Sequence, residues 1–286
     1  MRFELDSHRR TVGVTTVRER RVLSLGAGVQ SSALYLMAVH GEFGEERPEL
    51  AIFADTQWEP RAVYDWLSIL DAAGGSTIPI QRVTAGNIRA DALSGKRFAA
   101  MPLFVGNKEG KTGMMRRQCT NEYKIAPITK AIRSALGVAP RQRVPKGLRC
   151  ELWMGISTDE ATRMKDNRLP WLVNRYPLIE RDMSRRHCEA WLHDHGYPTP
   201  AKSACIGCPY TNDGRWREMK ATRPDEFADA VAFDNAMRSG VRFNALAGKA
   251  HLHRSLLPLA DVDLTTAEER GQVNMFENEC EGHCGV

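Results

Sequence analysis

A glycine- and serine-rich stretch between an apolar run and an apolar-periodic segment most constrains how this chain folds. Residues 22–25 predict a short buried strand, and Leu34, Leu36 and Met37 predict a helix after it. Residues 26–32, between them, contain two glycines and two serines. Glycines let the backbone approach an anion closely, and successive N–H groups at a helix N-terminus supply positive potential. The stretch is therefore a candidate phosphate-binding loop, although an ordinary strand-to-helix turn also favours Gly and Ser.

Alternating strand and helix patterns continue from this loop to residue 83. Residues 50–54 predict a second buried strand, which ends at Asp55 and Thr56, and Pro60 opens an amphipathic helix. Residues 77–83 predict a third strand, at an edge of the sheet because it contains a proline. This alternation is typical of a parallel sheet covered by helices. We therefore expect an α/β, Rossmann-like fold with helices on both faces of the sheet.

The remainder of the chain predicts further strands, more helices and a division into three parts. The glycine-rich, basic residues 95–118 interrupt the pattern as a long connection, either functional or disordered. Strands are expected at 151–156 and 171–178, and helices at 121–136, 184–195, 214–220 and 224–237. The expected parts are a basic, solvated N-terminal arm (1–20), a nucleotide-binding α/β domain (21–200) and a C-terminal helical, cysteine-bearing extension (201–286).

Composition narrows the class of protein only moderately. The chain is 42% hydrophobic and 26% charged, as globular proteins commonly are, and its net charge of +5 mildly favours polyanionic partners. No apolar run approaches the roughly 20 residues that cross a bilayer, and residues 1–21 lack the hydrophobic core of a secretory signal. Seven cysteines without such a signal indicate the reducing cytoplasm, where clustered thiols serve metal or redox chemistry more often than disulfides.

The candidate phosphate loop has two nucleotide-binding interpretations. Gly26 and Gly28, followed by Ser31, approximate a dinucleotide fingerprint, with Asp55 as the ribose ligand. However, Ser31 stands in place of the third glycine, and Thr56 directly follows Asp55. A serine-rich loop of this kind fits the phosphates of a mononucleotide better than it fits NAD or FAD.

The cysteines give the strongest metal signal in the chain. Cys205 and Cys208, in a Cys-x-x-Cys-Pro sequence, have the spacing with which two thiolates grip one soft metal or one cluster. Further ligands are needed, and the candidates are Cys119 in a basic segment and Cys280 or Cys284 in the tail. The pattern therefore predicts a four-thiolate site for iron–sulfur or zinc. The other two cysteines, at 150 and 188, are expected to be buried, inert thiols.

Four segments, taken together and in order, resemble the phosphoadenylyl-sulfate (PAPS) reductase family of the PP-loop adenine-nucleotide alpha hydrolases. They are residues 24–32, 53–56, 119–127 and 205–209, and residues 155–163 add a similar Gly-Ile-Ser to Glu-x-x-Arg strand end. The resemblance covers most of the chain, about residues 21–286.

The resemblance implies an adenine nucleotide at the carboxyl ends of the strands. Its expected contacts are Ser24, Gly26, Ala27, Gly28, Gln30, Ser31, Ser32, Asp55, Thr56, Lys124, Gly155 and Arg163. It also implies a [4Fe–4S] cluster on Cys119, Cys205 and Cys208, with Cys280 as the candidate fourth ligand and zinc as the alternative metal. The family's adenylyl-sulfate reductases carry a Cys-Cys pair where this chain has Gln118 and Cys119. The fourth ligand therefore stays open among Cys280, Cys284, Cys188 and an exogenous group.

Two chemistries divide the resembled family. In reductases, a tail cysteine attacks the sulfonyl sulfur of PAPS or APS, which here makes Cys280 or Cys284 the catalytic nucleophile. The chain departs from that tail motif, because Glu281 and Gly282 stand where Gly-Leu is typical. In ATP-pyrophosphatases, ATP with Mg²⁺ activates a substrate for sulfur insertion, but their loops carry an aspartate where this chain has Gln30.

The preferred hypothesis is a cytoplasmic PAPS reductase-like oxidoreductase with an iron–sulfur cluster. Its partners would be a sulfated adenine nucleotide and a thiol donor such as thioredoxin, without a membrane. The leading alternative is a sulfurtransferase that uses ATP and a cysteine desulfurase to thiolate tRNA or DNA, with the basic segments holding the polyanion. A third hypothesis, from another class, is a zinc-stabilised nucleotide-binding module without catalysis.

Overall fold

A five-stranded, all-parallel sheet forms the centre of the molecule. The computed structural model describes residues 18–94, 101–106, 112–239 and 249–265. The strand order is β3-β2-β1-β6-β7. The strands are β1 (Arg18–Ser24), β2 (Leu50–Asp55), β3 (Ile80–Thr84), β6 (Leu148–Met154) and β7 (Leu172–Arg175). The predicted α/β fold with a parallel sheet is confirmed. The third strand does lie at an edge, but it begins at Ile80, directly after Pro79, and so contains no proline.

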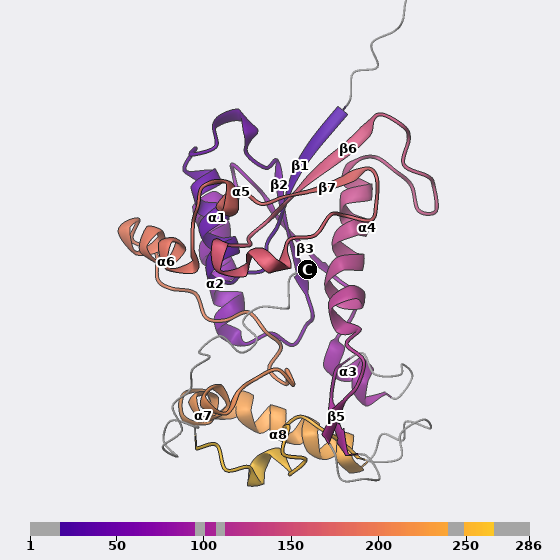
Figure 1. Cartoon of the computed structure of the whole chain (residues 1–286), viewed down its shortest axis with the longest axis vertical. Coiled ribbons are helices and arrows are strands. Elements are labelled where there is room, and N and C mark those ends of the chain that lie inside the picture. The colour runs from indigo at the N-terminus through magenta and orange to yellow at the C-terminus, as the bar shows by residue number, and fades with distance from the viewer. Residues whose placement is uncertain (1–17, 95–100, 107–111, 240–248, 266–286) are drawn as a thin grey trace, which may run out of the picture.

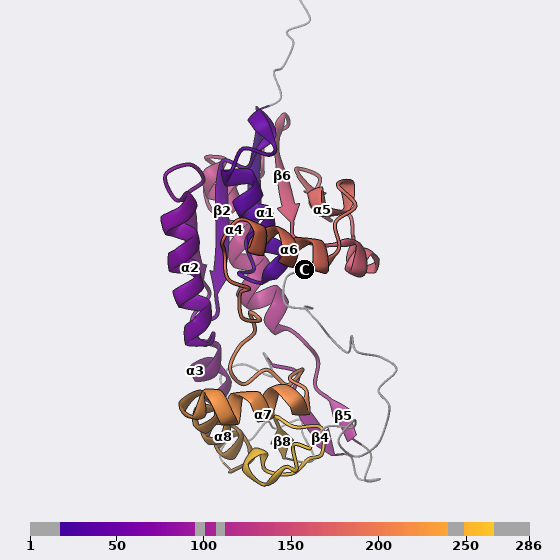
Figure 2. The same cartoon turned by 90° about the vertical axis from the view of Figure 1, so that its left-hand side faces the viewer.

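Helices cover both faces of this sheet (Figures 1 and 2). They are α1 (Val29–Val39), α2 (Arg61–Gly74), α4 (Ala126–Ala135), α5 (Pro177–Glu180) and α6 (Arg185–Asp194). Alternate residues of each strand belong to opposite cores: Leu23 packs with α1, α2 and α6, whereas Val22 packs with α4. The period-two alternation of β-strands thus divides the apolar residues of β1 between two helical layers.

The order of the strands places a topological switch point between β1 and β6. The chain runs outward from β1 to β2 and β3, then returns to add β6 and β7 on the other side. Ser24, the last residue of β1, is paired with Met154, the last of β6. In parallel α/β sheets, ligands bind in the crevice outside the carboxyl ends of the strands at such a point. The candidate phosphate loop begins there.

A second group of elements, below the sheet in Figure 1, has its own apolar core. It comprises α3 (Ile88–Leu93), α7 (Asp213–Thr222), α8 (Pro224–Ser239) and a three-stranded antiparallel sheet of β5 (Thr112–Met114), β4 (Phe104–Gly106) and β8 (Ala250–His251). The core combines Ile88, Met101 and Tyr123 with Trp216 and Phe233. It thus takes residues from both sides of the expected domain boundary at 200, and the domain division stays a prediction.

Three local predictions need correction. β1 begins at Arg18 instead of residue 22, because β6 offers pairing partners for Arg18–Arg20, which the predicted arm 1–20 had included. The expected strand 171–178 ends at Arg175, because Pro177 lacks an N–H for a strand ladder and opens α5. The segment 95–118, for which no strand was predicted, contributes β4 and β5.

One further element precedes α4. A π-helical stretch, Thr120–Ile125, leads directly into α4, where the sequence predicted one continuous helix. π-Helical turns are rare and occur frequently at functional sites. Among the helices of the described residues, none combines the length and the apolarity that crossing a membrane requires.

Candidate functional site

The loop between β1 and α1 is closed by a serine and contains a residue in the left-handed region. Ser31 Oγ accepts a hydrogen bond from the Gly26 N–H at 3.1 Å and donates to the Gly28 carbonyl at 3.3 Å. Ala27, fully buried, has φ = 56°, a conformation that costs a non-glycine residue about 1–2 kcal/mol. Backbone strain of this kind clusters at ligand-binding sites. The loop is therefore a constrained turn whose shape the surrounding structure imposes.

Gly28 is a glycine for which the protein itself supplies no reason. Its φ of −93° and ψ of 179° are open to any residue. A Cβ at this position would meet no atom within 4 Å. Neither backbone conformation nor packing thus requires glycine, although glycine is common at an N-cap such as this one. The open space at this position leaves room for a ligand to approach the backbone.

Gly155, at the end of β6, is required by packing. A Cβ there would lie 2.7 Å from the backbone nitrogen of Ser31 and 2.6 Å from its Cα. The absence of a side chain lets β6 and the start of α1 approach each other, and this approach forms one wall of the site.

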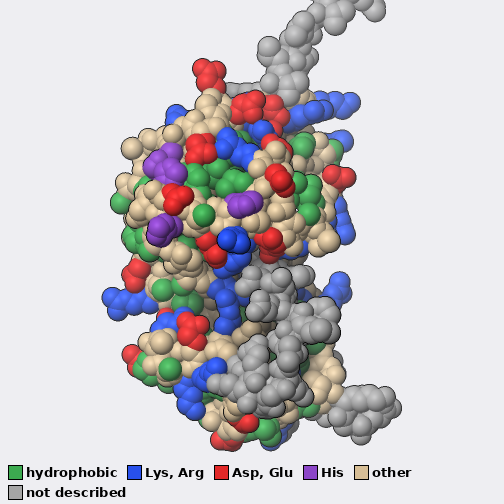
Figure 3. All heavy atoms as spheres, turned by 60° about the vertical axis from the view of Figure 1, so that its left-hand side comes forward, with side chains coloured by type: hydrophobic (Ala, Val, Ile, Leu, Met, Phe, Trp, Pro, Cys, Tyr) green, Lys and Arg blue, Asp and Glu red, His purple; other side chains and the backbone are tan. Residues whose placement is uncertain are grey.

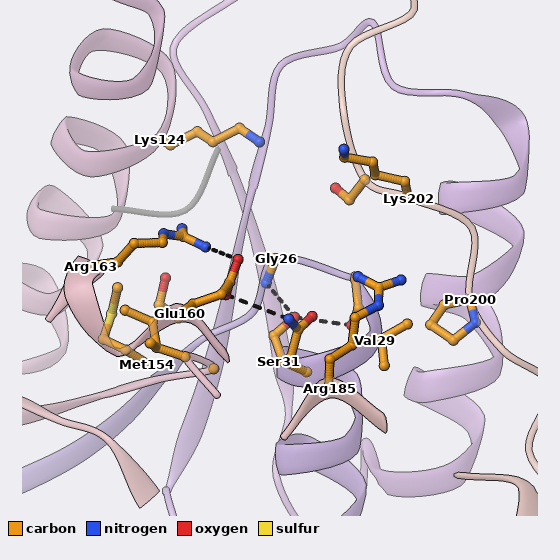
Figure 4. Close-up of a pocket in the computed structure, with 16 residues that line it drawn as sticks. Gly26, Val29, Ser31, Lys124, Met154, Glu160, Arg163, Arg185, Pro200 and Lys202 are labelled. Atoms are coloured by element: carbon orange, nitrogen blue, oxygen red, sulfur yellow. Dashed lines mark hydrogen bonds and ion pairs between the residues drawn. The ribbon is translucent and has the colours of Figure 1, made fainter. Parts of the chain in front are cut away.

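A cavity of about 120 Å³ opens above this loop (Figure 4). The predicted contacts that line it are Ser24, Gly26, Gly28, Gln30, Ser31, Lys124, Gly155 and Arg163. The side chains of Arg185, Lys202, Ser203 and Glu160 line it as well. Gln30 Nε2 donates to Glu160 Oε2 at 3.5 Å, and Arg163 pairs with Glu160 at 2.5 Å. Four cations and one carboxylate thus surround a loop rich in backbone N–H groups, which favours a polyanionic ligand.

Arg185 and Lys202 were missed by the sequence reasoning. They lie at the start of α6 and in the segment after it, and no motif marks either residue. Their position depends on α6 packing against α1, which brings this part of the chain to the phosphate loop. On the face shown in Figure 3, Lys and Arg side chains lie in the region between the sheet and the part that contains α7 and α8.

A second, more apolar cavity adjoins the first. Its volume is about 90 Å³, and it shares Ser24, Gly26, Lys124 and Met154 with the first cavity. Apolar side chains from β2, α4, β6 and β7 line it, among them Phe53, Ile128, Leu152 and Leu172. The amides of Asn167 and Asn174 also face it. A mainly apolar wall with a few amides suits a flat heterocycle.

Four of the predicted nucleotide contacts lie outside the two cavities. Ala27 and Ser32 are buried behind the loop, and Ser32 Oγ accepts a hydrogen bond from Trp66 Nε1 at 2.8 Å. Asp55 Oδ1 accepts hydrogen bonds from the Tyr64 hydroxyl and the Gln57 N–H. Thr56 lines a third cavity, which also contains the cysteines. Ser32 packs behind the loop, and the binding roles of all four residues stay predictions.

This third cavity, of about 30 Å³, brings together three predicted metal ligands. Cys119, Cys205 and Cys208 all line it, although they are far apart in the sequence. The Cys205–Cys208 turn rests on Trp58: the Ile206 N–H donates to the Trp58 carbonyl at 2.9 Å, and a Cβ on Gly207 would lie 2.1 Å from the Trp58 ring. The segment after β2 therefore positions the cysteine turn.

A buried polar chain connects the cysteine cavity with the first two cavities. The Cys205 thiol lies 3.3 Å from Thr56 Oγ1, which donates to Glu59 Oε1 at 3.0 Å. Lys124 Nζ lies 3.9 Å from the same Glu59 oxygen, and the Glu59 side chain is wholly buried. Lys124 lines all three cavities. One ammonium group thus stands between the cysteines and the phosphate loop.

The other described cysteines confirm the prediction of buried, inert thiols. Cys150 and Cys188 are fully buried, and burial raises the pKa of each thiol to about 12. Cys280 and Cys284, the predicted nucleophile and fourth ligand, lie outside the described residues. Within the described part of the chain, no group of three or more His, Cys, Asp or Glu side chains is placed to hold a single metal ion. A multi-atom cluster has more widely spaced thiolates than one ion does.

Comparison with known proteins provides one structural likeness. Neither the models of protein families nor the curated proteins include a match to the sequence. Among solved structures, the chain is similar to phosphoadenylyl-sulfate (PAPS) reductase from Candida auris in its phosphate complex. The identity is 12%, the TM-score is 0.40, and the match covers 64% of this chain and 74% of that one. The chain itself has an α/β, Rossmann-like fold with a cavity at its switch point, beside the candidate phosphate loop.

Proposed function

We propose that this chain is a PP-loop enzyme of sulfur metabolism that uses an adenine nucleotide, with the reduction of PAPS or APS as its preferred reaction. The observation that carries the proposal is the position of Lys124. Its side chain lines the cavity of the phosphate loop, the apolar cavity beside it and the cavity of the three cysteines. A nucleotide site and a thiol site that share one cation are arranged for chemistry between them.

The nucleotide would occupy the first two cavities. Its phosphates would lie on the N–H groups of residues 26–32, with Arg163, Arg185 and Lys202 as counter-charges. Its adenine would enter the adjoining apolar cavity, where the amides of Asn167 and Asn174 face the base. Glycine at position 28, which packing does not require, leaves room for this ligand.

The cysteine cavity fits the donor set of an iron–sulfur cluster. Cys119, Cys205 and Cys208 would be its thiolate ligands, and Lys124 and Arg117 line the same cavity and would stabilise their negative charge. When bound, such a cluster would supply a centre of soft, polarisable negative charge beside the nucleotide site. The Cys205–Thr56–Glu59–Lys124 chain would connect that charge with the phosphates.

In the proposed reductase reaction the tail cysteine would be the nucleophile, and the tail cysteine and a second thiol would together supply the two electrons. The thiolate of Cys280, or of Cys284, would attack the sulfonyl sulfur of the bound nucleotide and release the adenosine phosphate. The resulting enzyme thiosulfonate would then react with a second thiol, such as that of thioredoxin. That thiol would attack the enzyme cysteine sulfur and form a mixed disulfide, while sulfite would leave with the electron pair of the broken S–S bond. The second thiol of thioredoxin would then form the thioredoxin disulfide and release the enzyme thiolate.

Anaerobic calorimetry with ATP–Mg²⁺ and with PAPS tests this proposal. We expect tighter binding of PAPS, and we expect Arg163→Met to weaken it about tenfold, a loss of about 1.4 kcal/mol. Arg168→Met, an exposed arginine outside the cavities, is the matched control. A clear preference for ATP–Mg²⁺ would reject the reductase and support the alternative, ATP-dependent thiolation of tRNA or DNA.

The assignment of the nucleophile has its own test. Cys280→Ser and Cys284→Ser would be compared for sulfite release from PAPS in the presence of reduced thioredoxin. We expect one of them to abolish sulfite release. Full activity in both variants would exclude the tail as the source of the nucleophile.

A further inference from the structure

An arginine beside the cysteines has two buried nitrogen atoms that the described residues leave without an acceptor. Arg117 lies two positions before Cys119 and lines the same cavity. Its Nε and Nη2 atoms are buried and have no hydrogen-bond partner in the described part of the chain. A guanidinium is always protonated in proteins, and buried unsatisfied donors are rare in native structures. The cavity therefore has a place for an acceptor.

The charges around this cavity indicate that the acceptor is an anion. Arg117 and Lys124 line it, and none of the described residues on its wall is acidic. Lys124 Nζ pairs with the Glu59 carboxylate, whose Oε1 lies 3.9 Å away. The guanidinium of Arg117 instead packs over Tyr210, with its central carbon 5.3 Å from the centre of the ring. An aromatic face orients a guanidinium but does not accept its in-plane N–H groups.

The chemistry of the cavity identifies this anion. Three thiols share the wall with Arg117, and a cluster assembled on them would expose sulfide and thiolate sulfurs, which are anionic acceptors. On the basis of the proposed function, we infer that Arg117 donates its Nε–H and Nη2–H groups to sulfur atoms of the iron–sulfur cluster on Cys119, Cys205 and Cys208. Arg117 is then a positioning residue that holds the cluster and raises its reduction potential, because hydrogen bonds and positive charge stabilise the more negative, reduced state.

Three variants of the full-length chain separate this role from simple packing. Arg117→Met removes the charge and the N–H donors and keeps an apolar side chain. Arg117→Lys keeps the charge but lacks the planar set of N–H groups of a guanidinium. Arg116→Met makes the same change at an exposed neighbouring arginine and is the matched control. Each protein would be reconstituted anaerobically with ferrous iron and sulfide. Loss of cluster absorbance to a chelator and the midpoint potential of the cluster would then be measured.

We expect Arg117→Met to lose its cluster about tenfold faster than wild type, the effect typical of removing an outer hydrogen bond to a metal site. Its midpoint potential should move to a more negative value. Arg117→Lys should restore part of both properties, and Arg116→Met should match wild type in both.

The melting temperature provides a second readout, because Arg117→Met should change it in opposite directions in the cluster-free and the cluster-bound protein. Without the cluster, Arg117→Met removes a buried charge that lacks an acceptor, so its melting temperature should equal or exceed that of wild type. With the cluster bound, the same variant should melt below wild type. Equal destabilisation of both forms would show that Arg117 only packs and would overturn the inference.

The remaining outcomes distinguish this inference from the proposed function. If wild type takes up a cluster but Arg117→Met keeps wild-type cluster retention and potential, the inference is wrong and the proposed function stands. If reconstituted wild type binds no iron, the cluster of the proposed function is wrong, and the inference fails with it.

Discussion

Gly28 and Gly155 both line the cavity at the candidate phosphate loop, but packing requires only one of them. Gly155→Ala would place a Cβ 2.7 Å from the Ser31 nitrogen, and such overpacking lowers the free energy of unfolding by about 1–3 kcal/mol. Gly28→Ala meets no atom and should change that free energy by less than about 0.5 kcal/mol. Instead, it should weaken nucleotide binding about tenfold, because the methyl group occupies the ligand's space.

Urea denaturation and calorimetry of the two variants test this contrast. In urea, Gly155→Ala should be the less stable of the two variants. In calorimetry, Gly28→Ala should bind the nucleotide more weakly while keeping the stability of wild type. Unchanged affinity in Gly28→Ala would mean that the ligand does not approach the loop backbone.

The buried thiols of Cys150 and Cys188 predict a loss of stability at high pH. Burial raises the folded-state pKa of both from about 9 to about 12. Between these values the unfolded chain releases two protons that the folded chain retains, so unfolding becomes more favourable as pH rises. Each thiol contributes a slope of about 1.4 kcal/mol per pH unit in this window, and nothing below pH 8.

Denaturation at pH 8, 9 and 10 measures this slope. The double variant Cys150→Ala/Cys188→Ala should be less stable at pH 8 because of the cavities it creates, yet lose less stability between pH 9 and 10. A slope equal to that of wild type would contradict the raised pKa values.

At the scale of elements, the segment after β2 connects the sheet with the cysteine turn. Gly207 packs against the Trp58 ring, and Trp58 Nε1 donates to Asp229 Oδ2 of α8 at 2.6 Å. Gly207→Ala would force a Cβ to 2.1 Å from the ring. We expect a loss of about 1–3 kcal/mol of stability and a reduced iron content after reconstitution, because the turn must shift away from Trp58.

A compensating variant is the control for this prediction. Trp58→Leu, combined with Gly207→Ala, makes room for the new methyl group and should recover part of the iron content. Normal iron content in Gly207→Ala alone would show that the turn tolerates displacement.

Local sequence patterns predict most of the helices and strands. The end of β2 follows from the end of an apolar run. The start of α2 follows from Pro60 and its end from Gly74 and Gly75, and all these signals act within a few residues. β4 and β5 were not predicted, since their strands have only three residues each and depend on pairing with each other and with β8. The early start of β1 likewise depends on β6, a distant partner.

At the scale of the molecule, Asp234 holds the C-terminal described segment against α8. Its fully buried carboxylate accepts hydrogen bonds from the N–H groups of Leu252 and Leu259 at 2.8 and 3.0 Å and pairs with Arg238 at 3.0 Å. Asp234→Ala leaves two buried donors and one cation without acceptors, so the free energy of unfolding should fall by about 3–5 kcal/mol.

Hydrogen exchange localises this effect. The amides of Leu252 and Leu259 should lose protection, whereas those of β6, in the other core, should keep it. Asp225→Ala, an exposed carboxylate in the first turn of α8, should cost less than about 1 kcal/mol. Equal loss of protection in both cores would mean that they unfold as one unit.

Patterns of neighbouring residues predict the parallel sheet, its edge strand after Pro79 and the glycine- and serine-rich loop after the first strand. These features depend on apolar periodicity and on glycine, serine and proline, whose effects act on neighbouring residues. Packing between distant segments brings Cys119 and the Cys205–Cys208 turn to one cavity, which Thr56 also lines. It also brings Arg185 and Lys202 to the candidate phosphate loop. Such contacts join segments far apart in the chain, and their formation depends on how whole helices and strands pack.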